Sequence, residues 1–261
     1  MAEVIIAQNQ EQASSIAAEH IAQKIVNKPD FVLGLATGST PLALYKQLTQ
    51  IIQERQIDVS HVQGFALDEY VGLPKDHPES YFSVIRKEVV DPMGLNPDLI
   101  HTPSGDFGTV ETAGEYYETQ IKIAGGVDLQ ILGVGQDGHI GFNEPGSSLA
   151  SRTRIKTLTQ KTRQDNARFF DSIDQVPHHC VTQGIGTILE ARHLVLLAFG
   201  ETKADAIAGC VEGSISSSNP ASALQLHPHA TVLLDQAAAS KLQHKDYYQY
   251  AFENKPSWQG I

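Results

Sequence analysis

The chain has 261 residues and carries 19 Lys and Arg against 30 Asp and Glu, a formal net charge of −11. About 41% of the residues are hydrophobic and 19% are charged, which excludes a disordered chain and fits one α/β domain with a large core. The negative charge disfavours nucleic acid as a partner, and no apolar stretch approaches the roughly 20 residues that a membrane span needs. The first residues, MAEVIIAQNQEQ, lack a basic and a long apolar segment, so we expect a cytoplasmic protein.

Apolar runs and amphipathic segments alternate along the chain. The apolar runs predict buried strands at 31–36, 62–68, 127–134, 194–199 and 231–234. A period of 3.6 residues predicts helices at 11–26, 41–54, 80–90, 110–124 and 202–211. This order predicts a single α/β domain over 1–261 with a doubly wound, mostly parallel sheet. In such a sheet the ligand crevice lies beyond the carboxyl ends of the strands.

The strand at 31–36 is followed by Thr37-Gly38-Ser39-Thr40-Pro41. We expect Thr40 to cap the next helix and Pro41 to take its first position. The backbone N–H groups of Gly38, Ser39 and Thr40 at a helix start form a cradle suited to a phosphate group. The turn lacks the Gly-x-x-x-x-Gly-Lys-Ser/Thr pattern, so we expect no nucleoside triphosphate, and a capped helix without a ligand is the alternative.

The strand at 62–68 ends in two adjacent carboxylates, Asp68 and Glu69. Successive side chains of a strand point to opposite faces, so only one of the two can point into the crevice while the strand continues. Asp68 at this position could act as a general base, and the alternative is a carboxylate that caps the next turn.

A glycine-rich loop, GVGQDGHIGFNEPG, follows the third predicted strand. Gly133, Gly135 and Gly138 match the pattern G-x-G-x-x-G. The glycine, asparagine and proline residues that come next forbid the helix that a dinucleotide site requires, and no acidic residue stands about 20 positions later. A nicotinamide cofactor is therefore not expected.

The same loop holds Asp137, His139 and Glu144. Two flanking carboxylates orient a histidine and raise its pKa toward values that suit proton transfer near neutral pH. This set also suits a divalent ion, but no second histidine or Cys-x-x-Cys stands at ligand spacing, so we expect no metal. Acid–base catalysis is the chemistry that the loop favours.

Cations for an anionic ligand are scarce near the predicted strand ends. Lys203 starts the helix that follows the strand at 194–199, and Arg168 lies in TRQDNARFF. An ammonium beside a helix N-terminus suits a phosphate, whereas a solvated surface charge is the alternative for both residues. The chain has no G-x-S-x-G elbow, and Cys180 and Cys210 lack paired spacing, so both are expected to be inert buried thiols.

Five long strings strongly resemble the glucosamine-6-phosphate deaminase family: LATGSTPLALY, FALDEYVGLPKDHPESY, GVGQDGHIGFNEPGSSLASRTRIKT, TRQDNARFF and LQLHP. The resemblance implies a modified Rossmann-like fold and an enzyme that converts glucosamine 6-phosphate to fructose 6-phosphate and ammonia without metal or organic cofactor. It implies that Asp68 takes the C2 proton and returns a proton at C1 through an enolamine. It also implies that His139 opens the sugar ring while Asp137 and Glu144 orient it.

By the same resemblance, the sugar phosphate would bind the turn at Gly38, Ser39 and Thr40 together with Arg168 and Lys203. A mobile lid at about 158–183 would carry Arg168 onto the substrate. Certain members are hexamers activated by N-acetylglucosamine 6-phosphate, and the segment 147–156 resembles part of their effector site. The final string ENKPSWQGI looks shorter than in the regulated members, so the resemblance leaves effector control and a homo-oligomer open.

Two other functions compete with this interpretation. 6-Phosphogluconolactonase is a hydrolase of a related fold that shares the phosphate turn and a G-x-G-x-D-G-H loop, but the strings DEYVGL and FNEP resemble the deaminase. Related folds also serve as sugar-phosphate sensors in transcription regulators, which need a DNA-binding module. Only about 30 residues precede the first predicted strand, and they are not basic.

Overall fold

The computed structural model describes residues 2–256 and 258–261, and in this part of the chain seven strands form one parallel sheet. Across the sheet they are β1 (Glu3–Ile6), β10 (Ala230–Leu234), β9 (Leu194–Ala198), β6 (Leu129–Leu132), β2 (Val32–Leu35), β3 (Gln63–Ala66) and β5 (Ile100–His101). The five predicted strands and the doubly wound architecture are confirmed. The two edge strands, β1 and β5, were not predicted: β1 has the apolar run at residues 4–7, which was overlooked, whereas β5 has only two half-buried residues and no such run.

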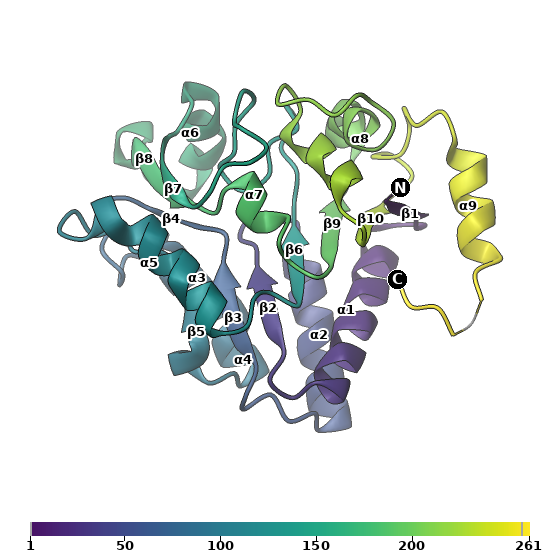
Figure 1. Ribbon diagram of the computed structural model, residues 1–261, viewed down its shortest axis with the longest axis horizontal. Coiled ribbons are helices and arrows are strands. Elements are labelled where there is room, and N and C mark those ends of the chain that lie inside the picture. The colour runs from purple at the N-terminus through teal and green to yellow at the C-terminus, as the bar shows by residue number, and fades with distance from the viewer. Residues whose placement is uncertain (1, 257) are drawn as a thin grey trace.

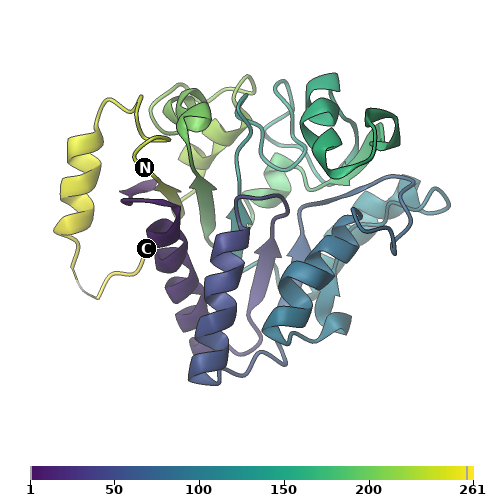
Figure 2. The same ribbon diagram turned by 180° about the vertical axis from the view of Figure 1, so that it is seen from behind.

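Helices cover both faces of this sheet (Figure 1). The helices are α1 (Gln10–Asn27), α2 (Leu42–Arg55), α3 (Tyr81–Ile85), α4 (Asp91–Met93), α5 (Val110–Ile123), α6 (Gln160–Asn166), α7 (Ile185–Ile188), α8 (Ala204–Val211) and α9 (Lys245–Glu253). α1 and α2 lie side by side on the face turned to the viewer in Figure 2, and α5 lies on the opposite face. Because both faces are covered, every residue of β9 is buried.

The five predicted helices are confirmed, with small differences at their ends. A π-helical turn at Arg86–Val90 joins α3 to α4, and together they fill the segment predicted as one helix. Short 3-10 turns lie at Pro97–Leu99, Ala167–Phe169, Ile173–Gln175, Glu201–Lys203 and Pro220–Leu226.

Local sequence sets the boundaries of α1. The Asn9 side chain accepts a hydrogen bond from the Gln12 amide at 2.9 Å, which satisfies one free N–H group of the first turn. Glu11 in the first turn and Lys24 in the last turn complement the helix dipole. The buried face of the helix is rich in alanine, which permits the close approach of α2.

A small antiparallel sheet lies above the carboxyl ends of the main sheet (Figure 1). Its strands are β4 (Asp68–Tyr70), β8 (His179–Thr182) and β7 (Arg154–Thr157), in that order. The sequence predicted one strand through Asp68, but β3 ends at Ala66. Leu67 still donates its amide to Leu35 O at 3.1 Å, and the chain then changes sheets and pairs with β8.

Among the residues that the structure describes, no helix is both long enough and apolar enough to cross a membrane. Cys180 and Cys210 are free and buried, as predicted. Burial raises the pKa of Cys210 to about 12, so its thiolate is scarce at neutral pH.

Candidate active site

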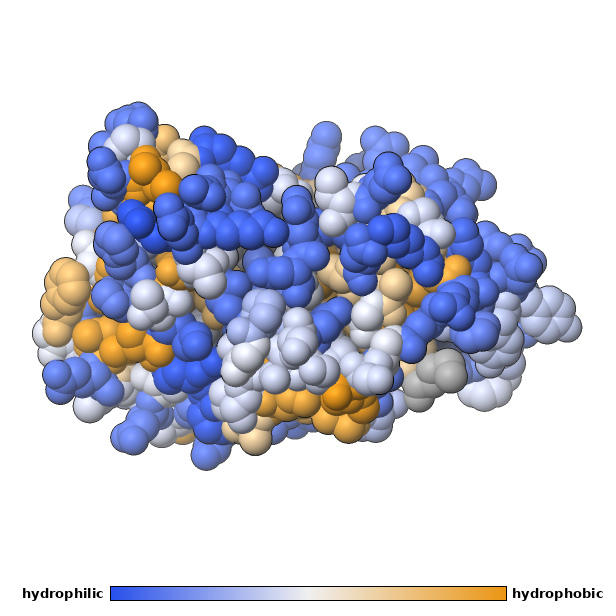
Figure 3. Space-filling view, turned by 90° about the horizontal axis from the view of Figure 1, so that it is seen from above, coloured by the Kyte–Doolittle hydropathy of each residue, from blue (hydrophilic) through white to orange (hydrophobic). Residues whose placement is uncertain are grey.

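The candidate site residues follow four strands that are neighbours in the sheet. β9, β6, β2 and β3 lie side by side and run parallel, so their carboxyl ends open onto one face of the molecule. Figure 3 views the molecule from this side, and hydrophilic residues dominate the surface. The topology thus brings together the three loops and the lysine that the sequence singled out.

The turn after β2 differs in one detail from its prediction. α2 begins at Leu42 with Pro41 as its N-cap, and no side chain caps it, so the predicted cap by Thr40 is wrong. Pro41 has a helical backbone (φ −80°, ψ −7°) but stands as the N-cap, so the helix begins one residue later than predicted. Gly38 adopts φ +90° and Ser39 is exposed, so this turn presents backbone to solvent.

Tyr45 of α2 braces this turn from inside. Its hydroxyl accepts a hydrogen bond from the Ala36 amide at 3.0 Å and donates one to Ala36 O at 2.9 Å. The side chain is buried, so the end of β2 is fixed at the point where the turn begins. Sequence periodicity places Tyr45 on the buried face of α2 but gives no signal for this bond.

Asp68 is buried with little hydrogen bonding. The residue is 5% exposed, Thr182 Oγ1 donates to Asp68 Oδ2 across a long 3.5 Å, and hydrogen bonding from Thr182 and the Phe142 amide only partly offsets the effect of burial on its pKa. Burial raises the pKa of Asp68 to about 8, and the neighbouring charge of Glu69 adds to that rise. A carboxylate with a pKa near neutral pH is suited to take and return a proton.

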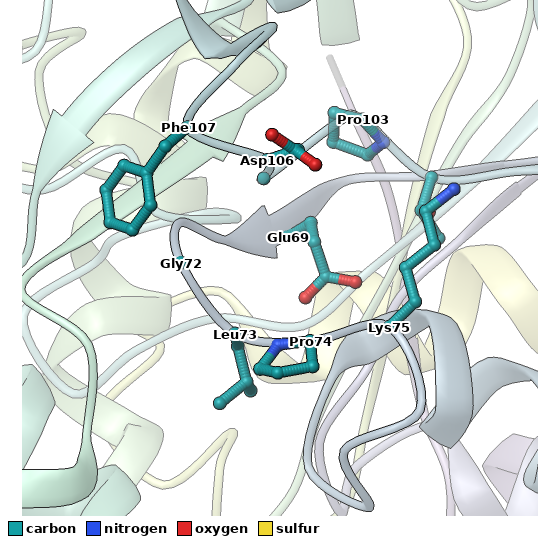
Figure 4. Close-up of a pocket in the computed structure, with 10 residues that line it drawn as sticks. Glu69, Gly72, Leu73, Pro74, Lys75, Pro103, Asp106 and Phe107 are labelled. Carbon is teal, nitrogen blue, oxygen red and sulfur yellow. The ribbon is translucent and has the colours of Figure 1, made fainter.

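Glu69 lies on the other side of β4, as strand alternation predicts. Its carboxylate accepts the amides of Tyr70, Tyr81 and Phe82 at 2.8–2.9 Å, two of which open α3. It lines a hollow of about 260 Å³ with Lys75 and Asp106, separate from the Asp137–His139–Glu144 cluster (Figure 4). Glu69 therefore caps the start of α3, which was the alternative role for a carboxylate here, and Asp68 remains the candidate base.

Asp137, His139 and Glu144 are brought together as predicted. Asp137 Oδ1 lies 2.7 Å from His139 Nδ1, and this hydrogen bond lowers the pKa of Asp137 well below its usual range. Glu144 Oε2 lies 3.8 Å from the same nitrogen and, among the described residues, has no hydrogen-bond partner. The ring is therefore held through Nδ1, which leaves Nε2 for a substrate.

Two glycines of this loop make room for candidate site side chains. A Cβ atom on Gly135 would lie 2.2 Å from the ring of His139. A Cβ atom on Gly141, which adopts φ +54° and follows the G-x-G-x-x-G match, would lie 3.3 Å from Asp68 Oδ2. The middle glycine of the match therefore serves close packing around His139, and no helix follows it.

The histidine and two carboxylates also satisfy the spacing of a metal site. One ligand atom from each of Asp137, His139 and Glu144 lies within 4.8 Å of the others. The bond between Asp137 and His139 Nδ1 has the length of an ordinary charge-assisted hydrogen bond, so a proton accounts for this geometry without a cation.

The two predicted cations differ in their surroundings. Lys203 is half-buried, and burial lowers its pKa while Asp137 and Asp165 act against that change. Arg168 is exposed and its guanidinium lies over the ring of Phe169 at 4.7 Å. In the described residues, no hydrogen bond or ion pair joins Arg168 to the turn after β2. The structure thus places Lys203 among the site groups and leaves Arg168 at the rim.

Four polar side chains at the site carried no sequence signal of their own. Asn166 Nδ2 donates to Tyr70 Oη at 2.9 Å, and Tyr81 Oη donates to the same oxygen at 3.4 Å. Thr162 Oγ1 donates to Glu144 Oε1. All four lie within the strings FALDEYVGLPKDHPESY and TRQDNARFF that carry the family resemblance, but nothing in those strings indicated these contacts.

The sequence matches a known family and several of its members. A profile of glucosamine-6-phosphate isomerases/6-phosphogluconolactonase matches residues 7–233. Glucosamine-6-phosphate deaminase of Bifidobacterium longum subsp. infantis is 59% identical over 270 residues, with 100% of both chains covered. Glucosamine-6-phosphate deaminase of Streptomyces coelicolor is 58% identical over 260 residues, covering 99% of this chain and 100% of the relative.

Solved structures show the same fold. A monomeric glucosamine-6-phosphate deaminase superposes with a TM-score of 0.89 at 44% identity, covering 92% of this chain and 100% of that chain. 6-Phosphogluconolactonase from Trypanosoma cruzi superposes with a TM-score of 0.74 at 20% identity, covering 93% of this chain and 97% of that chain.

Proposed function

The chain belongs to the family of glucosamine-6-phosphate isomerases and 6-phosphogluconolactonases, and from this premise we propose that the cluster of Asp68 and His139 is its catalytic centre. The protein is an enzyme, a glucosamine-6-phosphate deaminase, and it converts glucosamine 6-phosphate to fructose 6-phosphate and ammonia in amino sugar catabolism. The observation that carries the assignment of the centre is the buried side chain of Asp68 at the same end of the sheet as the Asp137–His139 pair.

Ring opening comes first in the proposed mechanism. A closed hemiacetal has no carbonyl group to acidify C2, so the C1 hydroxyl must lose a proton while the ring oxygen gains one. His139 carries out both transfers, because Asp137 fixes one ring nitrogen and leaves the other for the sugar.

Proton transfer between carbons follows. Asp68 takes the C2 proton of the open-chain aldehyde while O1 gains a proton, which gives an enolamine, and then returns a proton to C1 while the amino nitrogen loses one. The resulting ketimine at C2 adds water and releases ammonia, which leaves the C2 ketone of fructose 6-phosphate. The pKa of about 8 keeps Asp68 able both to accept and to return the proton near neutral pH.

The phosphate group anchors the sugar at a position remote from the reacting carbons. We assign it to the backbone of Gly38, Ser39 and Thr40 and to Lys203, with Arg168 approaching from the segment 158–183, which we propose is a lid on the single domain. Exposed backbone after β2 and a half-buried ammonium at the same edge support this assignment. Binding at a remote group orients C1 and C2 for the two proton transfers.

The decisive experiment measures ammonia and fructose 6-phosphate released from glucosamine 6-phosphate, without added metal and with a chelator present. Wild type should release both products, and Asp68→Asn should release neither while it still binds substrate. Hydrolysis of 6-phosphogluconolactone by a wild type that releases no ammonia would instead identify a lactonase. Silence on both substrates would favour a sugar-phosphate sensor.

We further propose that the enzyme acts in the cytoplasm on a free sugar phosphate, with neither nucleic acid nor a membrane as partner. A charged phosphate does not cross a bilayer unaided, and a net charge of −11 opposes nucleic acid. Sedimentation would decide between a monomer, as in the solved relative, and a homo-oligomer.

A further inference from the structure

Glu144 is held through only one of its two carboxylate oxygens. Oε1 accepts a hydrogen bond from the hydroxyl of Thr162 in α6 and a longer one, at 3.3 Å, from the hydroxyl of Thr159. Oε2 is buried, finds no partner among the described residues, and lies 3.8 Å from His139 Nδ1. Because a carboxylate is planar, the bond that fixes Oε1 also determines where Oε2 points.

The hydroxyl of Thr162 has a defined direction. Thr159 Oγ1 has one proton, with Thr162 Oγ1 at 3.0 Å and Glu144 Oε1 at 3.3 Å as its two acceptors, and with either acceptor the proton of Thr162 points at Glu144. Thr162 and Glu144 are each only 6% exposed, so water does not replace this bond at little cost. Thr159 also caps α6 by accepting the Thr162 amide at 3.1 Å, which ties the hydroxyl chain to the start of that helix.

α6 is fastened to the site at a second point. At its last residue, Asn166 Nδ2 donates to Tyr70 Oη at 2.9 Å, and this bond does not involve Glu144. Arg168 follows two residues later. One end of α6 therefore bonds the carboxylate that faces the histidine, and the other end bonds the tyrosine of β4.

We propose that Thr162 is a positioning residue: its hydroxyl aims the Glu144 carboxylate at His139, so that ring opening proceeds at full rate only while this hydrogen bond is made. The inference rests on the proposed function, because it needs His139 as the acid–base group. When His139 takes up a proton, the free oxygen of Glu144 compensates the charge of the ring. Without Thr162 only the longer bond from Thr159 holds Oε1, so the carboxylate turns away more easily and the charged ring loses that support.

The test compares three variants on glucosamine 6-phosphate. Thr162→Val keeps the shape and removes the donor, Thr162→Ser keeps the donor, and Asn166→Leu loosens the other end of α6. Thr162→Val should lower kcat about 10-fold, as expected for one hydrogen bond to a charged group, and leave KM within about threefold. Thr162→Ser should stay within about threefold of wild type, and Asn166→Leu should raise KM while kcat is retained.

Other results would overturn the proposal. They are an unchanged kcat in Thr162→Val, an equally impaired Thr162→Ser, or the same KM-only effect in Thr162→Val and Asn166→Leu. Thermal melting identifies a variant that fails to fold, and Thr162→Ala then serves as the second removal of the donor. If wild type releases no ammonia, the proposed function itself is wrong. If wild type is active and Thr162→Val has the same kcat, only the role of Thr162 is wrong.

Discussion

Asp68 and Glu69 are consecutive residues of β4, yet Glu69 accepts three backbone amides at 2.8–2.9 Å, while Asp68 is bonded at a long 3.5 Å by Thr182 and only weakly supported by the Phe142 amide. The amides stabilise the charge of Glu69, although burial raises its pKa. That fixed charge and burial together raise the pKa of Asp68 to about 8. One carboxylate thus tunes its neighbour for proton transfer.

We expect kcat/KM to rise with pH through about 8, as Asp68 loses its proton. In Glu69→Gln the repelling charge is gone, so Asp68 ionises more easily and the midpoint should fall by about one pH unit. The measurement is a pH profile of kcat/KM for both proteins. An equal loss of activity at every pH, with the midpoint unmoved, would assign Glu69 only to holding α3.

Asp68→Asn should stabilise the fold at alkaline pH. Because the pKa of Asp68 is higher in the folded than in the unfolded chain, the folded state holds the extra proton, and wild-type stability falls as pH rises from about 4 to about 8. The variant lacks this loss, so its advantage in the free energy of unfolding should grow from pH 5 to pH 9 and reach a few kcal/mol, which thermal melting shows as a growing difference in Tm. A constant difference in Tm would contradict the raised pKa.

His139→Gln should lose more activity on the cyclic sugar than on a substrate already in open-chain form. Only the cyclic substrate needs the ring nitrogen for opening, and the loss there should be about 100-fold or more. Steady-state rates on the two substrates make the comparison. Equal losses would argue that His139 acts after the ring has opened.

Lys203→Met should weaken binding of the phosphate group. Loss of one charge-assisted contact should raise KM about 10-fold or more and weaken competitive inhibition by inorganic phosphate to the same degree. The charge of Asp137 also acts on Lys203 and opposes the lowering of the Lys203 pKa by burial. A lower kcat with unchanged KM and unchanged phosphate inhibition would therefore point to Asp137 as its target.

Gly135→Ala should inactivate the enzyme, because the new Cβ atom would lie 2.2 Å from the His139 ring. Gly133→Ala is the matched control in the same motif, since its Cβ would meet nothing closer than Thr40 at 3.9 Å. We expect kcat to fall about 100-fold in the first variant and to stay near wild type in the second. Similar activity in both would show that the ring tolerates displacement.

The central sheet was predictable because its strands are buried on both faces and form apolar runs. β7 could not be predicted in this way, since its residues Arg154–Thr157 alternate between half-buried and exposed and contain two cations. β4 gains its pairing from β8, more than one hundred residues away in sequence. No local pattern indicates such a partner.

At the site, the loops were predictable because each carries its chemistry within a few residues of a strand end. Asp137, His139 and Glu144 are close in sequence as well as in space. The contacts of Thr162 and Asn166 depend on where α6 packs against Glu144 and Tyr70, so only the folded chain reveals them. The helix start at Pro41 was missed by one residue because proline itself fits the N-cap conformation found here.

The four adjacent strands β9, β6, β2 and β3 each deliver a separate part of the centre. The parts assigned to the phosphate follow β2 and β9, whereas the proton-moving groups follow β3 and β6. Exchanging the loops after β3 or β6 would therefore change the reaction while the binding of a phosphorylated sugar is kept. The same division makes the scaffold suited to evolve and to engineer new chemistry on one class of substrate.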